Sequence, residues 1–194
     1  MAQNNIDNFV SLINFILDKN KLSRPQLVHF VKKKADEMQN IDQLSNAEYS
    51  SLSQELIFSS TIDKELLQII TCKSSPLMVA ILVGNSDMIE LLLQNGANIE
   101  YKDKYNRSIL SYLSKNTDIE LIKSLILDYK IQDDSVSKYG TDSLLEAYDK
   151  DNLEVFSILI SSLSKEYKEQ RLKTFVMVGD LGLVSTSLRC TSDN

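Results

Sequence analysis

The feature that most constrains this chain is an internal repeat with a period of about 33 residues, which begins after residue 70. The repeated positions are mostly apolar, and one repeat length superimposes Ser75 on Ser108, Leu77 on Leu110, Ile89 on Ile122, Leu92 on Leu125 and Leu93 on Ile126. A further shift of 34 residues places Leu144 on Leu110, Phe156 on Ile122, Leu159 on Leu125 and Ile160 on Ile126, and it also places Ala147 on Leu113. The polar segments "DKYNRS" and "SKYGTD" also align. A repeat of this length is typical of a stacked array of small structural units.

Local signals within the clearest unit predict two short helices. Ser75 is a suitable N-cap, and Pro76 fits the first helical position, where its missing N–H costs nothing. We expect this helix to end near Gly84 and a second helix to begin at Ser86 or Asp87. The glycine of "QNGAN" can take the left-handed conformation that closes the second helix. Because one such pair cannot bury its apolar face alone, neighbouring units must stack.

The segment "SPLMVAILVGNSDMIELLLQNGANIEYKD" resembles the ankyrin repeat, with Ser-Pro-Leu-Met where that family usually has Thr-Pro-Leu-His. The resemblance implies an all-α fold, an ankyrin-repeat helical solenoid over residues 71–190 with an additional N-terminal helical region over residues 1–70. The expected units cover residues 74–106, 107–139 and 140–163, with a degenerate unit over 172–188.

The later units depart from the family pattern. In the second unit, Ile109 and Ser111 replace the usual Pro and His, and Tyr112 and Leu113 are bulky where alanines are usual. We therefore expect the second and third units to pack less regularly and to be locally less stable. The spacer before the fourth unit is short, so we expect the fourth unit to lack a hairpin. Such a unit could serve as the cap of the array.

The first 70 residues carry no clean repeat but show four helical stretches. A first helix is expected up to about Lys19, with an apolar face formed by Phe9, Ile13, Ile16 and Leu17. We expect the next two helices to begin at N-caps Ser23 and Ser45, and a fourth to cover residues 62–70. Residues 37–46 are interpreted as a polar loop.

Two organisations of this N-terminal region remain open. It could be a degenerate capping unit with extra helices, or a separate helical subdomain packed on the first repeat. A single continuous helical body is favoured, because residues 62–70 lead into Ser75 without a linker.

Composition narrows the function classes. A net charge of −6 and a pI of about 4.9 argue against a general binder of nucleic acid or anionic membranes. No stretch is apolar for the roughly 20 residues that membrane insertion requires. His29 is interpreted as structural, and Cys72 and Cys190 as reduced thiols that match no metal or redox spacing. We therefore expect no catalytic residues, no metal site and no cofactor.

The resemblance also implies a partner-binding surface, because ankyrin arrays usually bind at hairpin tips and at the exposed face of the first helices. Carried over position by position, this surface consists of Lys104, Tyr105, Arg107, Ser111, Lys115 and Asn116, then Lys138, Tyr139, Thr141, Asp149 and Lys150, with Leu82 and Val83 in the first unit. Tyrosine offers a rigid anchor and arginine a directional fork. Alternatively, each tyrosine packs under its own hairpin, and Leu82 and Val83 face residues 62–70.

These observations favour a protein–protein interaction module that acts without catalysis, as a monomer in the cytoplasm. The alternative is the N-terminal or targeting part of a larger secreted effector whose catalytic activity lies in residues 1–70 or outside this chain. The amino-acid composition is rich in Asn, Lys, Ile and Ser, and the repeat units are degenerate. In both respects the chain resembles the ankyrin proteins that intracellular bacteria or large DNA viruses send into host cells. A third hypothesis is a scaffold that self-associates through Leu82 and Val83 or through the N-terminal helices.

Overall fold

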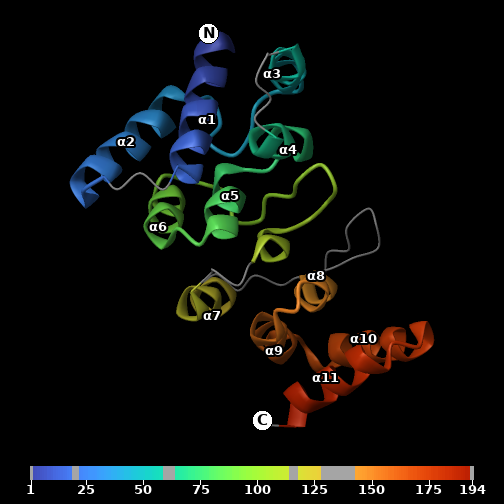
Figure 1. Cartoon of the computed structure of the whole chain (residues 1–194). Helices are drawn as coiled ribbons and strands as arrows, with labels where there is room; N and C mark the ends of the chain where they lie inside the picture. Colours follow the sequence, from blue (N-terminus) through green and yellow to red (C-terminus); the bar gives the residue numbers. More distant parts are fainter. Residues whose placement is uncertain (1, 19–21, 59–63, 114–117, 128–142, 193–194) are drawn as a thin grey trace.

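The computed structural model shows an all-α chain built as a column of helix pairs (Figure 1). It describes residues 2–18, 22–58, 64–113, 118–127 and 143–192. The N-terminal helices are α1 (Ala2–Leu17), α2 (Arg24–Glu37), α3 (Asn46–Phe58) and α4 (Lys64–Cys72). The following elements are α5 (Pro76–Val83), α6 (Ser86–Gln94), the 3₁₀ turn η1 (Ile109–Tyr112), α7 (Ile119–Leu127), α8 (Ser143–Asp149), α9 (Leu153–Ser162), α10 (Lys165–Val178) and α11 (Leu181–Ser192).

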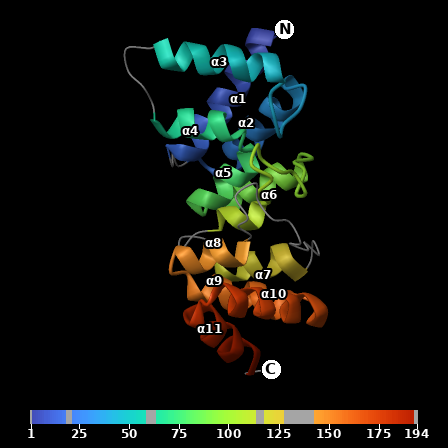
Figure 2. The same ribbon diagram turned by 90° about the vertical axis from the view of Figure 1, so that its right-hand side faces the viewer.

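Successive layers of the column pack directly on one another. On one side α1 contacts α5, α5 contacts η1, and η1 contacts α8. On the other side α2 contacts α6, α7 contacts α9, and α9 contacts α11. Figure 2 shows the resulting column, with the N-terminal helices at one end and α11 at the other. The apolar stripes that the repeat predicted are therefore buried between layers.

The pair α3 and α4 stands outside this order. Both helices lie between α2 and α5 in the sequence, yet α1 packs on α5 without them. α3 packs against α4 and against α1, to one side of the column (Figure 1). The N-terminal region thus contains one stacking layer, α1 with α2, and one inserted helix pair.

α1 buries the face that its periodicity predicted. Phe9, Ile13 and Ile16 are completely buried, and α1 ends at Leu17. The polar side chain of Asn5 is also buried, and its amide nitrogen donates to Glu48 Oε1 at 3.0 Å. Its amide oxygen accepts the backbone N–H of Gln39 at 3.1 Å, so Asn5 links α1 to the segment between α2 and α3.

That segment, residues 38–45, corrects the interpretation of a polar loop over 37–46. Met38, Ile41 and Leu44 are buried and belong to the core. They were missed because polar neighbours surround these single apolar residues, each three positions from the next. The segment ends at Ser45, where Glu48 Oε2 accepts the backbone N–H of Ser45 at 2.8 Å, as expected of a capping box.

The helix pair of the clearest unit forms at its predicted positions. Ser75 Oγ accepts the backbone N–H of Met78 at 3.2 Å and caps α5, which ends where Gly84 takes a left-handed conformation with φ of 70°. Asn85 caps α6 in the same way, so the chain turns through two residues between the helices. α5 is buried over most of its surface because α1, α6 and η1 surround it.

The second unit is irregular, as its departures from the family pattern predicted. Instead of a helix after Ser108, the chain forms the single turn η1, and the Ser108 side chain does not cap it. The turn ends at Leu113, whose ψ of 135° is not helical, and the Tyr112 hydroxyl at its end bonds Asp103 and Ser74.

The expected unit over residues 172–188 falls within the last layer, α10 with α11. α10 begins at Lys165, capped by Ser164, whose Oγ accepts the backbone N–H of Tyr167 at 3.3 Å. Only Leu163 and Ser164 join α9 to α10, so this layer has no hairpin before it, in agreement with the short spacer.

Candidate partner-binding surface

The hairpin tip over residues 103–107 is closed by its own backbone. The N–H of Asp103 donates to the carbonyl of Arg107 at 3.1 Å, and the N–H of Asn106 donates to the carbonyl of Asp103 at 3.0 Å. Asn106 takes a left-handed φ of 64°, a conformation that Asn tolerates better than most residues. The N–H of Lys104 donates to the carbonyl of Cys72 at 2.9 Å, which attaches the tip to the end of α4.

The carboxylate of Asp103 organises the tip from inside, and its side chain is fully buried. Oδ1 accepts the backbone N–H groups of Tyr105 at 2.8 Å and of Arg107 at 2.9 Å. Oδ2 accepts Arg107 Nε at 2.7 Å and the hydroxyl of Tyr112 at 2.9 Å. Four donors thus satisfy one buried carboxylate, one of them a guanidinium that balances its charge.

The Arg107 side chain is held by the protein itself. Its Nη2 donates to the Tyr112 hydroxyl at 3.0 Å, and its guanidinium lies 5.0 Å from the Tyr112 ring centroid and 5.6 Å from that of Tyr105. Partial burial works to lower the pKa of Arg107, but Tyr112 and Asp103 outweigh it, and the pKa lies above its ordinary value. Arg107 therefore stays charged and supports the tip.

The Tyr112 hydroxyl also meets Ser74 Oγ at 2.8 Å, between α4 and α5. Burial raises the pKa of Tyr112 well above its ordinary value, which keeps the hydroxyl protonated and able to donate. The tip, the turn η1 and the start of α5 are thus joined through one phenol.

Lys104 and Tyr105 form the outer part of the tip. Lys104 is exposed and Tyr105 is half-buried, with the Lys104 ammonium 5.8 Å from the Tyr105 ring centroid. The Tyr105 ring therefore packs against Arg107 as one alternative predicted, and its contact with a partner stays a prediction.

A second group of predicted residues lies on η1 and α8. Ser111 is buried, and its carbonyl accepts Lys150 Nζ at 3.0 Å. Lys150 also pairs with Glu146 at 3.4 Å, while burial raises the pKa of Glu146 above its ordinary value. Asp149 is exposed beside Lys150. The structure thus brings Ser111 and Lys150 together and leaves Asp149 on the surface.

Leu82 and Val83 lie at the end of α5 that is remote from the attachment of the tip at Cys72. Leu82 is 38% exposed, whereas Val83 is half-buried and packs on the core. The structure therefore does not bring this pair together with the tip. The remaining predicted positions lie outside the described residues: Lys115, Asn116, Lys138, Tyr139 and Thr141.

Comparison with known families decides what the column of helix pairs is. The family model described as ankyrin repeats (3 copies) matches residues 43–134 and 77–171, which together cover well over half of the chain. The chain belongs to the ankyrin-repeat family. A search of curated proteins found no match. Ankyrin repeats are generally protein–protein interaction modules and are typically non-catalytic.

The first match of the ankyrin repeats begins at residue 43, upstream of the unit that the sequence placed at 74–106. The boundary at residue 70 between an N-terminal region and the ankyrin array therefore stays a prediction. None of the helices that the structure describes is long and apolar enough to cross a membrane. The described residues also hold no group of three or more His, Cys, Asp or Glu side chains placed to bind a metal ion.

Two residues that organise the ankyrin hairpin were missing from the predicted site. Asp103 was not singled out, although an Asp four residues before an Arg in a turn segment is a signal for side-chain to backbone bonds. Tyr112 was noted for its bulk, but the sequence does not reveal that its hydroxyl meets Asp103, Ser74 and Arg107.

Proposed function

We propose that this ankyrin-repeat protein binds a partner protein through its hairpin tips and the adjoining helix ends, without chemistry of its own. The observation that carries the proposal is the internal support of the tip by the buried Asp103 carboxylate. A tip that is ordered before binding loses little conformational entropy when a partner arrives, and this favours affinity.

The contact groups in this proposal are those that the internal network leaves at the surface. Lys104 and the outer face of Tyr105 supply a charge and a rigid aromatic ring at the tip. Asp149 and Lys150 add polar contacts at the end of α8, and Leu82 adds an apolar contact at the end of α5. Arg107 contributes mainly by holding Tyr105 in place.

We also propose that the protein acts as a monomer in a cytosol, including that of a host cell to which it is delivered as an effector. The degenerate units and the Asn- and Lys-rich usage support this part of the proposal.

The test is affinity purification from a eukaryotic cytosol followed by mass spectrometry, with the full chain as bait. Lys104→Ala/Tyr105→Ala should lose the specific partner, since it removes the outer tip and leaves Asp103 and Arg107 in place. Lys165→Ala/Tyr167→Ala on α10 changes the same two residue types and should retain it. A partner that survives the first double variant, with thermal unfolding unchanged, would contradict the proposal.

A further inference from the structure

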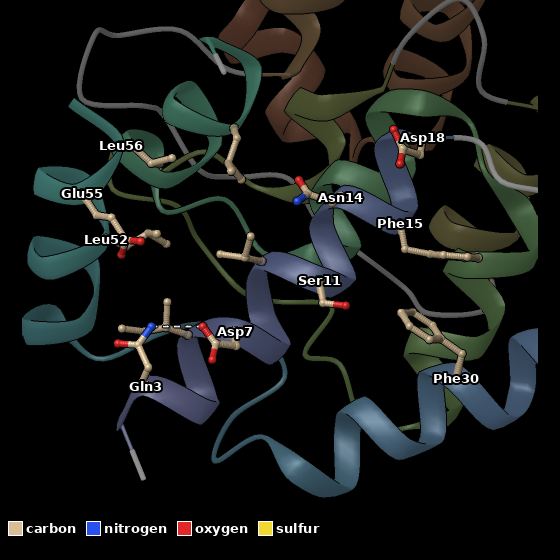
Figure 3. A pocket seen from close by; sticks show the side chains of 13 residues that line it. Gln3, Asp7, Ser11, Asn14, Phe15, Asp18, Phe30, Leu52, Glu55 and Leu56 are labelled. Carbon is tan, nitrogen blue, oxygen red and sulfur yellow. Dashed lines mark hydrogen bonds between the residues drawn. The ribbon is translucent and has the colours of Figure 1, made fainter. Parts of the chain in front are cut away.

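A groove of about 570 Å³ runs along α1, near the N-terminal end of the column (Figure 3). Its floor is one face of α1, because Gln3, Asp7, Val10 and Asn14 line it at spacings of three or four residues. The floor continues to Asp18, just beyond the helix, and so extends over about 22 Å at about 1.5 Å per residue. None of the residues assigned to the hairpin tips contributes to it.

The walls of the groove come from helices on both sides of α1. α2 supplies Phe30, whose ring lies 4.6 Å from that of Phe15 on α1, measured between centroids. On the opposite side, α3 supplies Leu52 and Leu56 (Figure 3). The lining also includes Leu66 of α4. The inserted pair α3 and α4 thus turns the side of α1 into a trough with apolar walls.

The charges along this trough have one sign. Asp7 and Glu55 are exposed and line it, and no lysine or arginine is among its described lining residues. The Asp7 carboxylate accepts the amide of Gln3 at 3.0 Å, a neutral partner that leaves its charge uncompensated. A chain segment that enters the trough is therefore favoured if it carries positive charge beside an apolar stripe.

We propose that this groove binds an amphipathic helix of a partner protein, with an apolar stripe on the α1 floor and lysines or arginines along its edges. The length of the floor corresponds to a helix of about 15 residues. Apolar walls with charged edges suit the helix-in-groove mode of recognition, which reads anchors spaced three and four residues apart. This is a second binding surface, independent of the one proposed at the hairpin tips.

The charge test uses a fluorescein-labelled synthetic helix of about 15 residues, with leucines on one face and lysines on both flanks, and follows anisotropy at low salt. Asp7→Lys/Glu55→Lys should weaken its binding about tenfold, since two attractive contacts become repulsive. A companion peptide with glutamates in place of the lysines should bind this variant more tightly than the wild type. Asp36→Lys/Glu169→Lys makes the same change in net charge outside the groove and should leave both affinities unchanged.

A second variant tests the shape of the groove. Ser11 lies half-buried in the floor, and Ser11→Trp should fill the groove and abolish binding of the lysine peptide, with helicity and thermal unfolding unchanged. The proposal is overturned if the wild type does not bind the lysine peptide, or if the charge control weakens binding as much as Asp7→Lys/Glu55→Lys. A concentration-dependent dimer that Ser11→Trp abolishes would assign the groove to a second copy of the chain instead.

Discussion

The carboxylate of Asp42 accepts the backbone N–H of Asn98 with both oxygens, at 2.9 and 3.0 Å, although 56 residues separate the two. This contact joins the segment before α3 to the segment after α6, and so links the first two layers of the column. Asp42→Ala should lower the free energy of unfolding by about 1–2 kcal/mol, because the N–H of Asn98 loses its acceptor. Urea denaturation measures the effect, and Gln43→Ala, at an exposed neighbour, is the control expected near zero.

The same carboxyl should make stability depend on pH. Burial raises the pKa of Asp42 above its ordinary 3.8, and the hydrogen bond from Asn98 lowers it by less. Because the folded-state pKa is the higher one, Asp42 favours the folded state most below 3.8 and loses that contribution as the pH rises through the folded-state pKa. The stability of the wild type relative to Asp42→Asn should therefore fall in thermal unfolding as the pH rises above the ordinary pKa of 3.8. A relative gain with rising pH would refute the assignment.

Tyr112→Phe tests the support of the hairpin tip. The substitution removes one hydroxyl that bonds Asp103, Ser74 and Arg107, so it should cost about 1–3 kcal/mol. Amide hydrogen exchange at Arg107 should also become faster, because its N–H bonds to the carboxylate that the hydroxyl helps to hold. Lys104→Ala, which leaves these bonds intact, should change neither quantity. Unchanged exchange in Tyr112→Phe would show that the tip does not depend on the hydroxyl.

Gly182, in α11, packs against the hydroxyl of Tyr148 on α8. A Cβ at this position would overlap the Tyr148 hydroxyl, so Gly182→Ala should destabilise the last layer by about 1 kcal/mol in spite of the higher helix propensity of alanine. In a Tyr148→Phe background the nearest obstruction is gone and Asp180 Oδ1 stays at 3.2 Å from the added Cβ, so the same substitution should cost less. A double-mutant cycle in urea measures the coupling. Equal effects in the two backgrounds would show that the ring moves aside without cost.

Local signals predicted the helices of the clearest unit because each of them acts within a few residues. The N-cap Ser75 and the left-handed Gly84 fixed the ends of α5, and Ser45 with Glu48 fixed the start of α3. The repeat then predicted that the pairs stack, since no pair buries its apolar face alone.

The arrangement of the N-terminal helices was beyond these signals. The sequence of α1 does not predict that α1 packs on α5 while α3 and α4 pack to the side of the column. That arrangement depends on the complementarity of helix surfaces that are distant in the sequence. The hairpin network was hidden for a similar reason: the Tyr112 hydroxyl reaches Asp103 only after the turn η1 has folded. Asp103 in its turn segment was the one sequence signal that could have predicted part of this network.

The direct packing of α1 on α5 also sets an order of events during synthesis. The helices α1 and α2 leave the ribosome before α5 and α6, which end at Gln94. Until then α1 can pack only on α2 and α3, where Phe9 meets the ring of Tyr49. The rest of its apolar face lacks a packing surface until α5 has followed, because contacts distant in sequence form late. The layer of α1 and α2 therefore gains its full stability only after the next layer has been made.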